Sequence, residues 1–306
     1  IWGIYGQRFD SSGNAAGAEF RINTHTANNQ QSAQITSLPD GGFLAMFGSD
    51  SSTHAQPDTS FFGAYGQRYD ASGNPVGTEF RINTYTSNHQ GSATATGLTD
   101  GGFVISWSSY GQDEASSWGI YGQRYDASGT AVGSEFKVNS NNSNDQHYSS
   151  ITFLDDGGFL VVWQSSEQDG SGTGIYGQRY ASNGETVGSE FVINSTTNND
   201  QARASVTSVS DGNIVVAWSS AGQDGDGNGI FAQIFDTGTS SSSGSSYGSS
   251  STTTGSSSSS SSSSSSTTLD SPANATVAIT AIDNAIKTVN IQRSKLGAVS
   301  NRLSHT

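Results

Sequence analysis

The sequence predicts a mainly β fold: a propeller-like array of four-stranded antiparallel blades, followed by a Ser-rich linker and one C-terminal α-helix. The first observation is a stretch that reads GIYGQRYDASGTAVGSEF from Gly119 and recurs along the chain. Its other copies begin at Gly3, Gly63, Gly174 and, in half-length form, Gly229, at spacings of 60, 56, 55 and 55 residues. The second is an Asp-Gly turn in the same phase of successive repeats. A fixed period of this size is typical of repeat architectures whose units stack to bury a shared core.

Each repeat holds the elements of one blade. The β-branched and aromatic run at Ile120 predicts a strand, and Asp126 to Gly129 has the composition of a turn that leads into a second strand. A polar connector ending in Gln precedes two more strands, which are joined by a turn such as Asp156-Gly157-Gly158. Four short strands in about 55 residues suit a propeller blade better than a β-helix coil or an immunoglobulin-like unit. The predicted blades are 33–83, 92–139, 149–194 and 204–236, the last without its outer strand.

The repeat pattern predicts a separate hairpin at 1–23, before the first complete blade. Two arrangements are compatible with the sequence. The hairpin would complete the last blade and close a four-bladed ring, or the ring has more blades than these residues encode. The chain opens inside a repeat and stops inside a helical pattern, so we expect it to be a fragment of a longer protein.

Two sets of side chains recur in the repeats. One large aromatic residue on the fourth strand of each repeat is either a sugar-stacking platform or a core residue, and we favour the core. These residues are Phe47, Trp107, Trp163 and Trp218. An arginine and a glutamate also recur, and we expect a cross-strand ion pair on each hairpin rather than a ring of anion-binding arginines. The pairs are Arg8/Glu19, Arg68/Glu79, Arg124/Glu135 and Arg179/Glu190.

The composition limits the kinds of binding partner to expect. The 306-residue chain has a formal net charge of −14, which argues against nucleic acid or an anionic membrane as a partner. It has no cysteine and no apolar run long enough to cross a bilayer. An acidic chain rich in Gly, Ser and Asn fits a secreted bacterial surface protein.

The loops that enter each hairpin carry the metal-like signal. The last one places Asp224, Asp226 and Asn228 at alternate positions with glycines between them. Oxygen side chains at this spacing suit a hard cation, so we expect calcium as a cofactor there, with an ordinary Asp/Gly turn as the alternative. The five histidines show no metal-binding spacing, and no nucleophile or phosphate-loop motif is present. We therefore expect the chain not to be an enzyme.

Three domains follow from the composition shifts. The repeats occupy 1–237, a Ser/Thr/Gly tract that we expect to be a flexible tether covers 238–269, and a helical pattern fills 270–306. Ser271 and Pro272 suit a helix start. The helix carries a coiled-coil seam that requires a partner helix. The seam comprises Ile282, Ile286, Val289, Leu296 and Leu303.

The tail resembles a known family. Ala281 to Ile286, Gln292-Arg293 and Leu296 to Leu303 are similar in order and spacing to the carboxy-terminal rod helix of bacterial flagellin, with Ser300 where that helix usually has Gln. The resemblance covers about 35 residues. It implies a filament subunit, exported without a cleaved signal, whose terminal helices pair in the filament core. The repeats are separately similar, more loosely, to those of bacterial surface and adhesin-like proteins.

The sequence thus favours a structural subunit of an extracellular bacterial flagellar filament involved in motility, with the repeat domain as its outward-facing variable domain. Its partners would be other copies of the same subunit, joined by helix pairing, and surface glycans. The alternative is a secreted adhesin or carbohydrate-binding propeller. An upstream amphipathic helix would favour the first function, and a signal peptide or adhesin modules the second.

Overall fold

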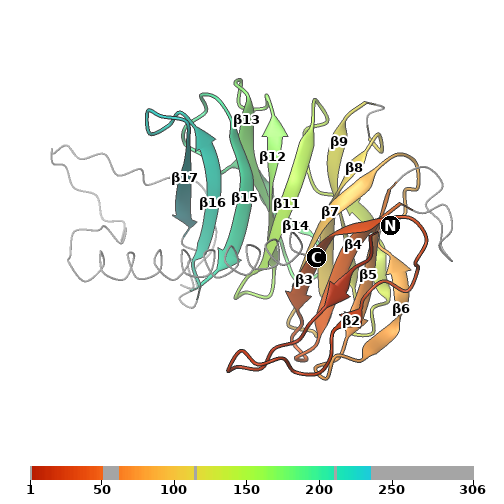
Figure 1. Ribbon diagram of the computed structural model, residues 1–306. Helices are drawn as coiled ribbons and strands as arrows, with labels where there is room; N and C mark the ends of the chain where they lie inside the picture. The colour runs from red at the N-terminus through yellow and green to blue at the C-terminus, as the bar shows by residue number, and fades with distance from the viewer. Residues whose placement is uncertain (1, 51–61, 114–115, 210–211, 236–306) are drawn as a thin grey trace. The chain divides into compact units, whose positions relative to one another are not determined.

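The computed structural model describes residues 2–50, 62–113, 116–209 and 212–235 (Figure 1). All helices and strands assigned in these ranges are β-strands, with no helix among them, which confirms the mainly β prediction. The described residues contain no helix that could span a membrane. The predicted linker, the C-terminal helix and its seam lie outside the described residues.

The strands form antiparallel sheets that follow one another along the chain. We call the four main sheets blades 1 to 4. Blade 1 contains β3 (Gln30–Ser37), β4 (Phe43–Ser49), β5 (Gly63–Tyr69) and β6 (Pro75–Arg81). Blade 2 contains β7 (Gln90–Gly97), β8 (Phe103–Tyr110), β9 (Trp118–Tyr125) and β10 (Ala131–Lys137). Blade 3 contains β11 (Gln146–Phe153), β12 (Phe159–Ser166), β13 (Thr173–Tyr180) and β14 (Thr186–Val192). Blade 4 contains β15 (Gln201–Ser208), β16 (Ile214–Ala221) and β17 (Asn228–Phe235).

The first strand of each blade contacts the first strand of the next, so β3, β7, β11 and β15 succeed one another as the inner strands of a propeller-like array. Figure 1 shows the four sheets side by side in chain order. Each blade begins about where the repeats predict, and blade 4 has three strands among the described residues, as expected.

The core lies between the blades. Trp163 is fully buried on the face of blade 3 toward blade 2, where it belongs to a cluster with Leu98, Val104 and Ile120. Trp107 and Trp218 occupy the same position one blade earlier and one blade later, at 0% and 5% exposure. The core interpretation of these aromatic residues is therefore confirmed, and they form no sugar platform.

The N-terminal hairpin packs against blade 1. Its strands β1 (Tyr5–Gly6) and β2 (Phe20–Arg21) form a separate two-stranded sheet. Ile4 and Ile22 pack on Phe47 of blade 1, as Ile120 and Val138 pack on the residues of blade 3. The hairpin does not supply the fourth strand of blade 4.

A buried Asn–Gln pair ties each hairpin to the next inner strand. Asn139 Oδ1 accepts the Ile120 backbone N–H at 2.7 Å, and Asn139 Nδ2 donates to Gln146 Oε1 at 3.0 Å. The Gln146 amide in turn donates to the Ser143 carbonyl at 2.8 Å. The pair recurs three more times, as Asn23/Gln30, Asn83/Gln90 and Asn194/Gln201. The Gln that ends each connector therefore satisfies buried backbone groups, which would otherwise be costly to desolvate.

The predicted Arg–Glu ion pairs are wrong. Arg124 pairs with Asp100 of the turn between β7 and β8 at 3.3 Å, and Glu135 Oε2 accepts the Thr84 backbone N–H at 2.8 Å. Arg124 lies opposite Val132 before a register shift in this ladder, and Phe136 lies opposite Gly122 after it, so Glu135 does not face Arg124 in either register. Arg68 and Arg179 likewise pair with the turn carboxylates Asp40 and Asp156. Each of these arginines ties a strand to a turn of its own blade, and Glu135 ties blade 2 to the connector after blade 1. The arginines are therefore structural.

Candidate functional site

Each inner strand contains a β-bulge at the same place. The ladder to the second strand shifts register near its start, and the third residue takes a left-handed conformation, with φ between 53° and 59°. These residues are Ser32, Ser92, Tyr148 and Arg203. A positive φ is uncommon for residues other than glycine. Bulges redirect a side chain, and they are over-represented beside functional sites.

Hydrogen bonds to the preceding blade hold two of these bulges. The Tyr148 backbone N–H donates to Ser108 Oγ at 3.3 Å, and the Arg203 backbone N–H donates to Gln164 Oε1 at 3.1 Å. Ser108 lies on β8 and Gln164 on β12, each the second strand of the blade before. The directions in which Tyr148 and Arg203 leave their strands are therefore fixed by two blades at once.

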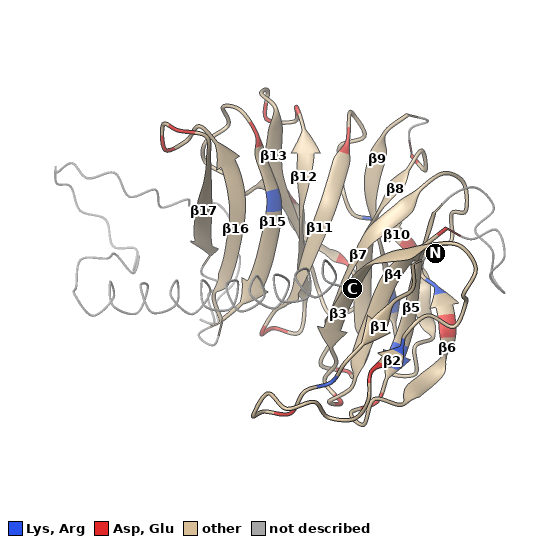
Figure 2. Cartoon of the chain, viewed as in Figure 1, with Lys and Arg blue, Asp and Glu red and all other residues tan. Residues whose placement is uncertain are grey.

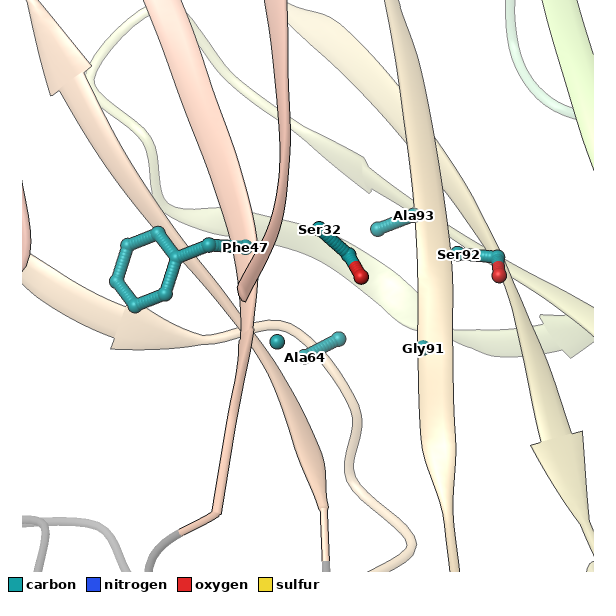
Figure 3. Close-up of a pocket in the computed structure, with 7 residues that line it drawn as sticks. Ser32, Phe47, Ala64, Gly91, Ser92 and Ala93 are labelled. Carbon is teal, nitrogen blue, oxygen red and sulfur yellow. The ribbon is translucent and has the colours of Figure 1, made fainter. Parts of the chain in front are cut away.

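The bulges of blades 1 and 2 present small side chains instead. Figure 3 shows Ser32 and Ser92 at a shallow pocket between the two blades, beside Phe47, Ala64 and Ala93. The pocket is too narrow to admit a water molecule. We therefore place no ligand there.

Four rings of blades 2 and 3 and one guanidinium of blade 4 form a continuous set of side chains that we call the aromatic cluster. It runs from Tyr110 to Trp118 (ring centroids 5.3 Å apart), from Trp118 to His147 (4.5 Å) and from His147 to Tyr148 (5.4 Å). The guanidinium of Arg203 completes it, 5.8 Å from the Tyr148 ring centroid. Tyr148 is 46% exposed, Arg203 is exposed, and the other three are half-buried.

Strand polarity brings these residues together. Tyr110 ends β8, Trp118 begins β9, and His147, Tyr148 and Arg203 stand near the starts of their inner strands. In an antiparallel blade, the start of the first strand, the end of the second and the start of the third lie at the same edge. The cluster therefore sits at one edge of the blades, across three of them.

The electrostatics of the cluster favour a single positive charge. Burial lowers the pKa of His147, and the nearby Asp145 only partly opposes this, so the imidazole is neutral at pH 7. Asp145 Oδ1 accepts the Trp118 backbone N–H at 3.1 Å. Arg203 is then the cation of the cluster. Figure 2 shows acidic residues, in red, in turns and loops at the strand ends.

This arrangement has the chemistry of a sugar-binding surface. Flat aromatic faces pack against the apolar faces of sugar rings, while the phenol hydroxyls, the imidazole and the guanidinium supply hydrogen bonds to hydroxyl groups. Ligand sites typically combine aromatic walls with a few placed polar groups.

This cluster was not predicted from the sequence, although the repeats carry a signal for it. At the two bulge positions the copies read Gln31-Ser32, Gly91-Ser92, His147-Tyr148 and Ala202-Arg203. Scaffold positions stay nearly constant between copies, so positions that vary while keeping the same unusual backbone are the ones free to acquire a ligand.

The predicted calcium residues lie in the loop between β16 and β17. Asp224 and Asp226 are exposed there, and Asn228 is the exposed first residue of β17. Asp224 Oδ1 accepts the Asp226 backbone N–H at 3.3 Å. A Cβ built on Gly229 would lie 2.5 Å from Asp224 Oδ2, so this carboxylate folds back onto its own loop. Calcium binding stays a prediction.

Titration calorimetry of the full-length chain with calcium checks that prediction. We expect weak binding that Asp226→Ala abolishes, because two carboxylates and one amide supply few of the ligands that calcium prefers. Asp126→Ala, in a turn of blade 2, is the matched control and should leave the binding heat unchanged. No heat at about 1 mM calcium, an affinity still typical of weak extracellular modules, would contradict the site.

Known sequences match only a small part of the chain. No family model matches the chain. A flagellin of Clostridium tyrobutyricum is 60% identical over 38 residues, which are 12% of this chain and 10% of the flagellin. The chain thus matches about a tenth of that relative's length.

Solved structures match more of the chain at low identity. A protein of unknown function from Dyadobacter fermentans DSM 18053 has a TM-score of 0.54 and 11% identity, covering 76% of this chain and 68% of its own. The Hadza microbial sialidase Hz136 has a TM-score of 0.48 and 12% identity, covering 67% and 44%. An endo-arabinase from Bacteroides thetaiotaomicron VPI-5482 has a TM-score of 0.46 and 16% identity, covering 74% and 81%. At these identities the likeness shows the fold alone.

One expectation is corrected by these structures. The chain was expected not to be an enzyme, because its sequence contains no familiar catalytic motif. Glycoside hydrolases recur among the similar solved structures, so that exclusion is wrong. Catalytic residues of such enzymes are brought together by the fold, and a search for contiguous motifs does not detect them.

Proposed function

We propose that the repeat domain is an extracellular carbohydrate-binding domain and that the aromatic cluster is its binding surface. The observation that supports this most is the backbone of the bulges, which holds Tyr148 and Arg203 outward through hydrogen bonds to the preceding blade. Because the backbone at these residues is fixed in advance, less conformational freedom is lost on binding, and this preorganisation raises affinity.

The length of the cluster suits a chain of sugars rather than a single one. Four rings and a guanidinium succeed one another with steps between 4.5 and 5.8 Å, over three blades. A polysaccharide laid along this line would contact several of the rings at once. Each contact is weak, and their sum gives useful affinity.

Binding of soluble polysaccharides to the full-length chain tests the proposal. Arabinan, xylan, dextran and polygalacturonate form the panel, and affinity gel electrophoresis measures retention. We expect at least one of them to retard the chain. Tyr148→Ala and Trp118→Ala should each weaken that binding about tenfold or more, the scale at which truncation of an anchor residue costs about 1.4 kcal/mol.

The control for these variants is Tyr5→Ala. Tyr5 is 59% exposed on the N-terminal hairpin, away from the cluster, so its loss should leave binding unchanged. Release of reducing ends is measured in the same samples, to separate binding from hydrolysis. If no polysaccharide retards the wild-type chain, or if Tyr5→Ala weakens binding as much as Tyr148→Ala, the proposal fails.

A second function concerns the tail, supported by the flagellin match. The match covers 38 residues, close to the length of the predicted tail at 270–306. We assign the match to this tail, and we propose that it pairs with an amino-terminal flagellin helix to anchor the repeat domain on a filament. The repeat domain would then carry its carbohydrate-binding surface outward from the filament.

Mixing the full-length chain with an amino-terminal rod segment of the Clostridium tyrobutyricum flagellin tests this pairing. An isolated helix of this length is marginal in water, so partner binding should raise helicity in circular dichroism and increase light scattering. Ile286→Asp or Leu296→Asp should abolish both gains, because a charge in a packed seam is costly. Lys287→Asp, beside the seam, is the control. Unchanged signals on mixing would contradict the filament function.

A further inference from the structure

We infer that the aromatic cluster binds an acidic polysaccharide, with the carboxylate of one sugar paired to the guanidinium of Arg203. This inference rests on the proposed carbohydrate-binding function and adds the class of ligand. It comes from a comparison of Arg203 with the other arginines of the described blades.

The arginines of the repeat already have partners within the chain. Arg8 donates to the Ala71 backbone carbonyl at 2.7 Å. Arg68, Arg124 and Arg179 each form an ion pair with the aspartate of their own blade's first turn, and their side chains are only 10–17% exposed. Arg203 belongs to a different position, the bulge of β15. Within the described ranges Arg203 has no carboxylate partner, and its guanidinium lies over the Tyr148 ring. Its charge therefore remains available to a ligand.

The acidic residues nearest in sequence are held by backbone groups. Asp200, three residues before Arg203, accepts the Thr173 backbone N–H at 3.1 Å. In the same way Asp145, just before blade 3, accepts the backbone N–H of Trp118 in blade 2. Each carboxylate fixes the start of a third strand rather than approaching the exposed guanidinium. An incoming carboxylate therefore does not have to displace an internal partner.

The held geometry suits a carboxylate in particular. A guanidinium offers parallel N–H donors that match the two oxygens of a carboxylate, and such bidentate pairs are both strong and directional. The Tyr148 ring beneath Arg203 then contacts the face of the same sugar, while His147 and Trp118 extend the platform to its neighbours. The chain as a whole is strongly acidic, with a net charge of −14, so only a local and specific contact would attract a polyanion.

The experiment compares two forms of one polymer. Polygalacturonate carries a free carboxylate on each sugar, and its methyl ester has the same sugars without the charge. We expect the full-length chain to bind polygalacturonate at least tenfold more tightly than the ester. Arg203→Gln should remove this preference while leaving binding to the ester, which uses the rings alone. Arg21→Gln, an exposed arginine on the N-terminal hairpin, should leave the preference intact.

The outcomes separate the two proposals. Equal binding of both polymers by the wild-type chain overturns the inference and leaves the carbohydrate-binding function standing. A preference that survives in Arg203→Gln also overturns it. Dextran sulfate bound as tightly as polygalacturonate, and equally dependent on Arg203, would replace the carboxylate by anions in general and overturn the assignment. Failure to bind any polymer defeats the proposed function itself. Unfolding midpoints of both variants, expected to match the wild type, exclude misfolding as the cause.

Discussion

Trp163→Ala should lower the free energy of unfolding of the full-length chain by about 3–5 kcal/mol, the range for truncating a large aromatic residue in a well-packed core. Trp163 is completely buried between blades 2 and 3, and it packs in one cluster with Leu98 and Val104 of the blade before. Alanine would leave a cavity where the two blades meet, and the residues around it would lose their packing contacts. Urea-induced unfolding, followed by tryptophan fluorescence and circular dichroism together, measures the change.

Trp2→Ala is the matched control, because Trp2 is 66% exposed on the N-terminal hairpin. Its replacement should change the free energy of unfolding by less than about 0.5 kcal/mol, as surface substitutions usually do. A loss below about 1 kcal/mol for Trp163→Ala would mean that the blades do not share the core described above. Equal losses for the two variants would contradict it as well.

The blades could be predicted because the sequence repeats at a nearly constant spacing. The Asp-Gly turns and the alternation of apolar residues fixed the hairpins, and the strands lie close to the predicted limits. Each blade nevertheless begins about three residues earlier than predicted, at the Gln that ends the connector. The bulge that follows interrupts the alternation after two residues, so the first pair of each inner strand shows no strand-like pattern. The alternation of apolar and polar residues therefore does not reveal the start of a strand that contains a bulge.

The charge pairing and the site could not be predicted from the sequence either. The recurrence of Arg124 and Glu135 suggested a cross-strand pair, but Arg124 lies opposite Val132, and each of the two charged residues has another partner. The positive φ of Tyr148 is equally invisible in the sequence, because Tyr is not a residue that favours it. The sequence shows that Asn139 and Gln146 recur in each repeat, but it does not show what they bind. Asn139 accepts a hydrogen bond from the backbone of Ile120, 19 residues away, and donates one to Gln146.

Gly158→Ala should destabilise the chain by about 1–3 kcal/mol, although the position looks like an ordinary turn glycine. A Cβ at Gly158 would lie 2.2 Å from the Tyr180 carbonyl oxygen and 3.1 Å from Asp156 Oδ1. The Gly158 N–H already donates to that carboxylate at 2.9 Å, and its carbonyl accepts the Leu154 N–H, so the turn cannot rotate away. Tyr180 is held as firmly, because it pairs with Phe159 on one side and Thr186 on the other. The loss of backbone freedom in the unfolded chain offsets only about 0.4–1 kcal/mol of the strain.

Blade 4 supplies the contrast within the same chain. Asn213 stands where the other blades have this glycine, and its carbonyl accepts the Val209 N–H at 2.9 Å as in the other turns. The facing residue there is Phe235 of β17, which has no fourth strand beside it in the described part of blade 4. Its carbonyl can move to make room for a Cβ, so Asn213→Gly should relieve no strain and stay within about 0.5 kcal/mol of the wild type. Urea unfolding of the two variants measures both values. Equal effects at 158 and 213 would show that the fourth strand does not pin the third, and a neutral Gly158→Ala would show that the turn adapts.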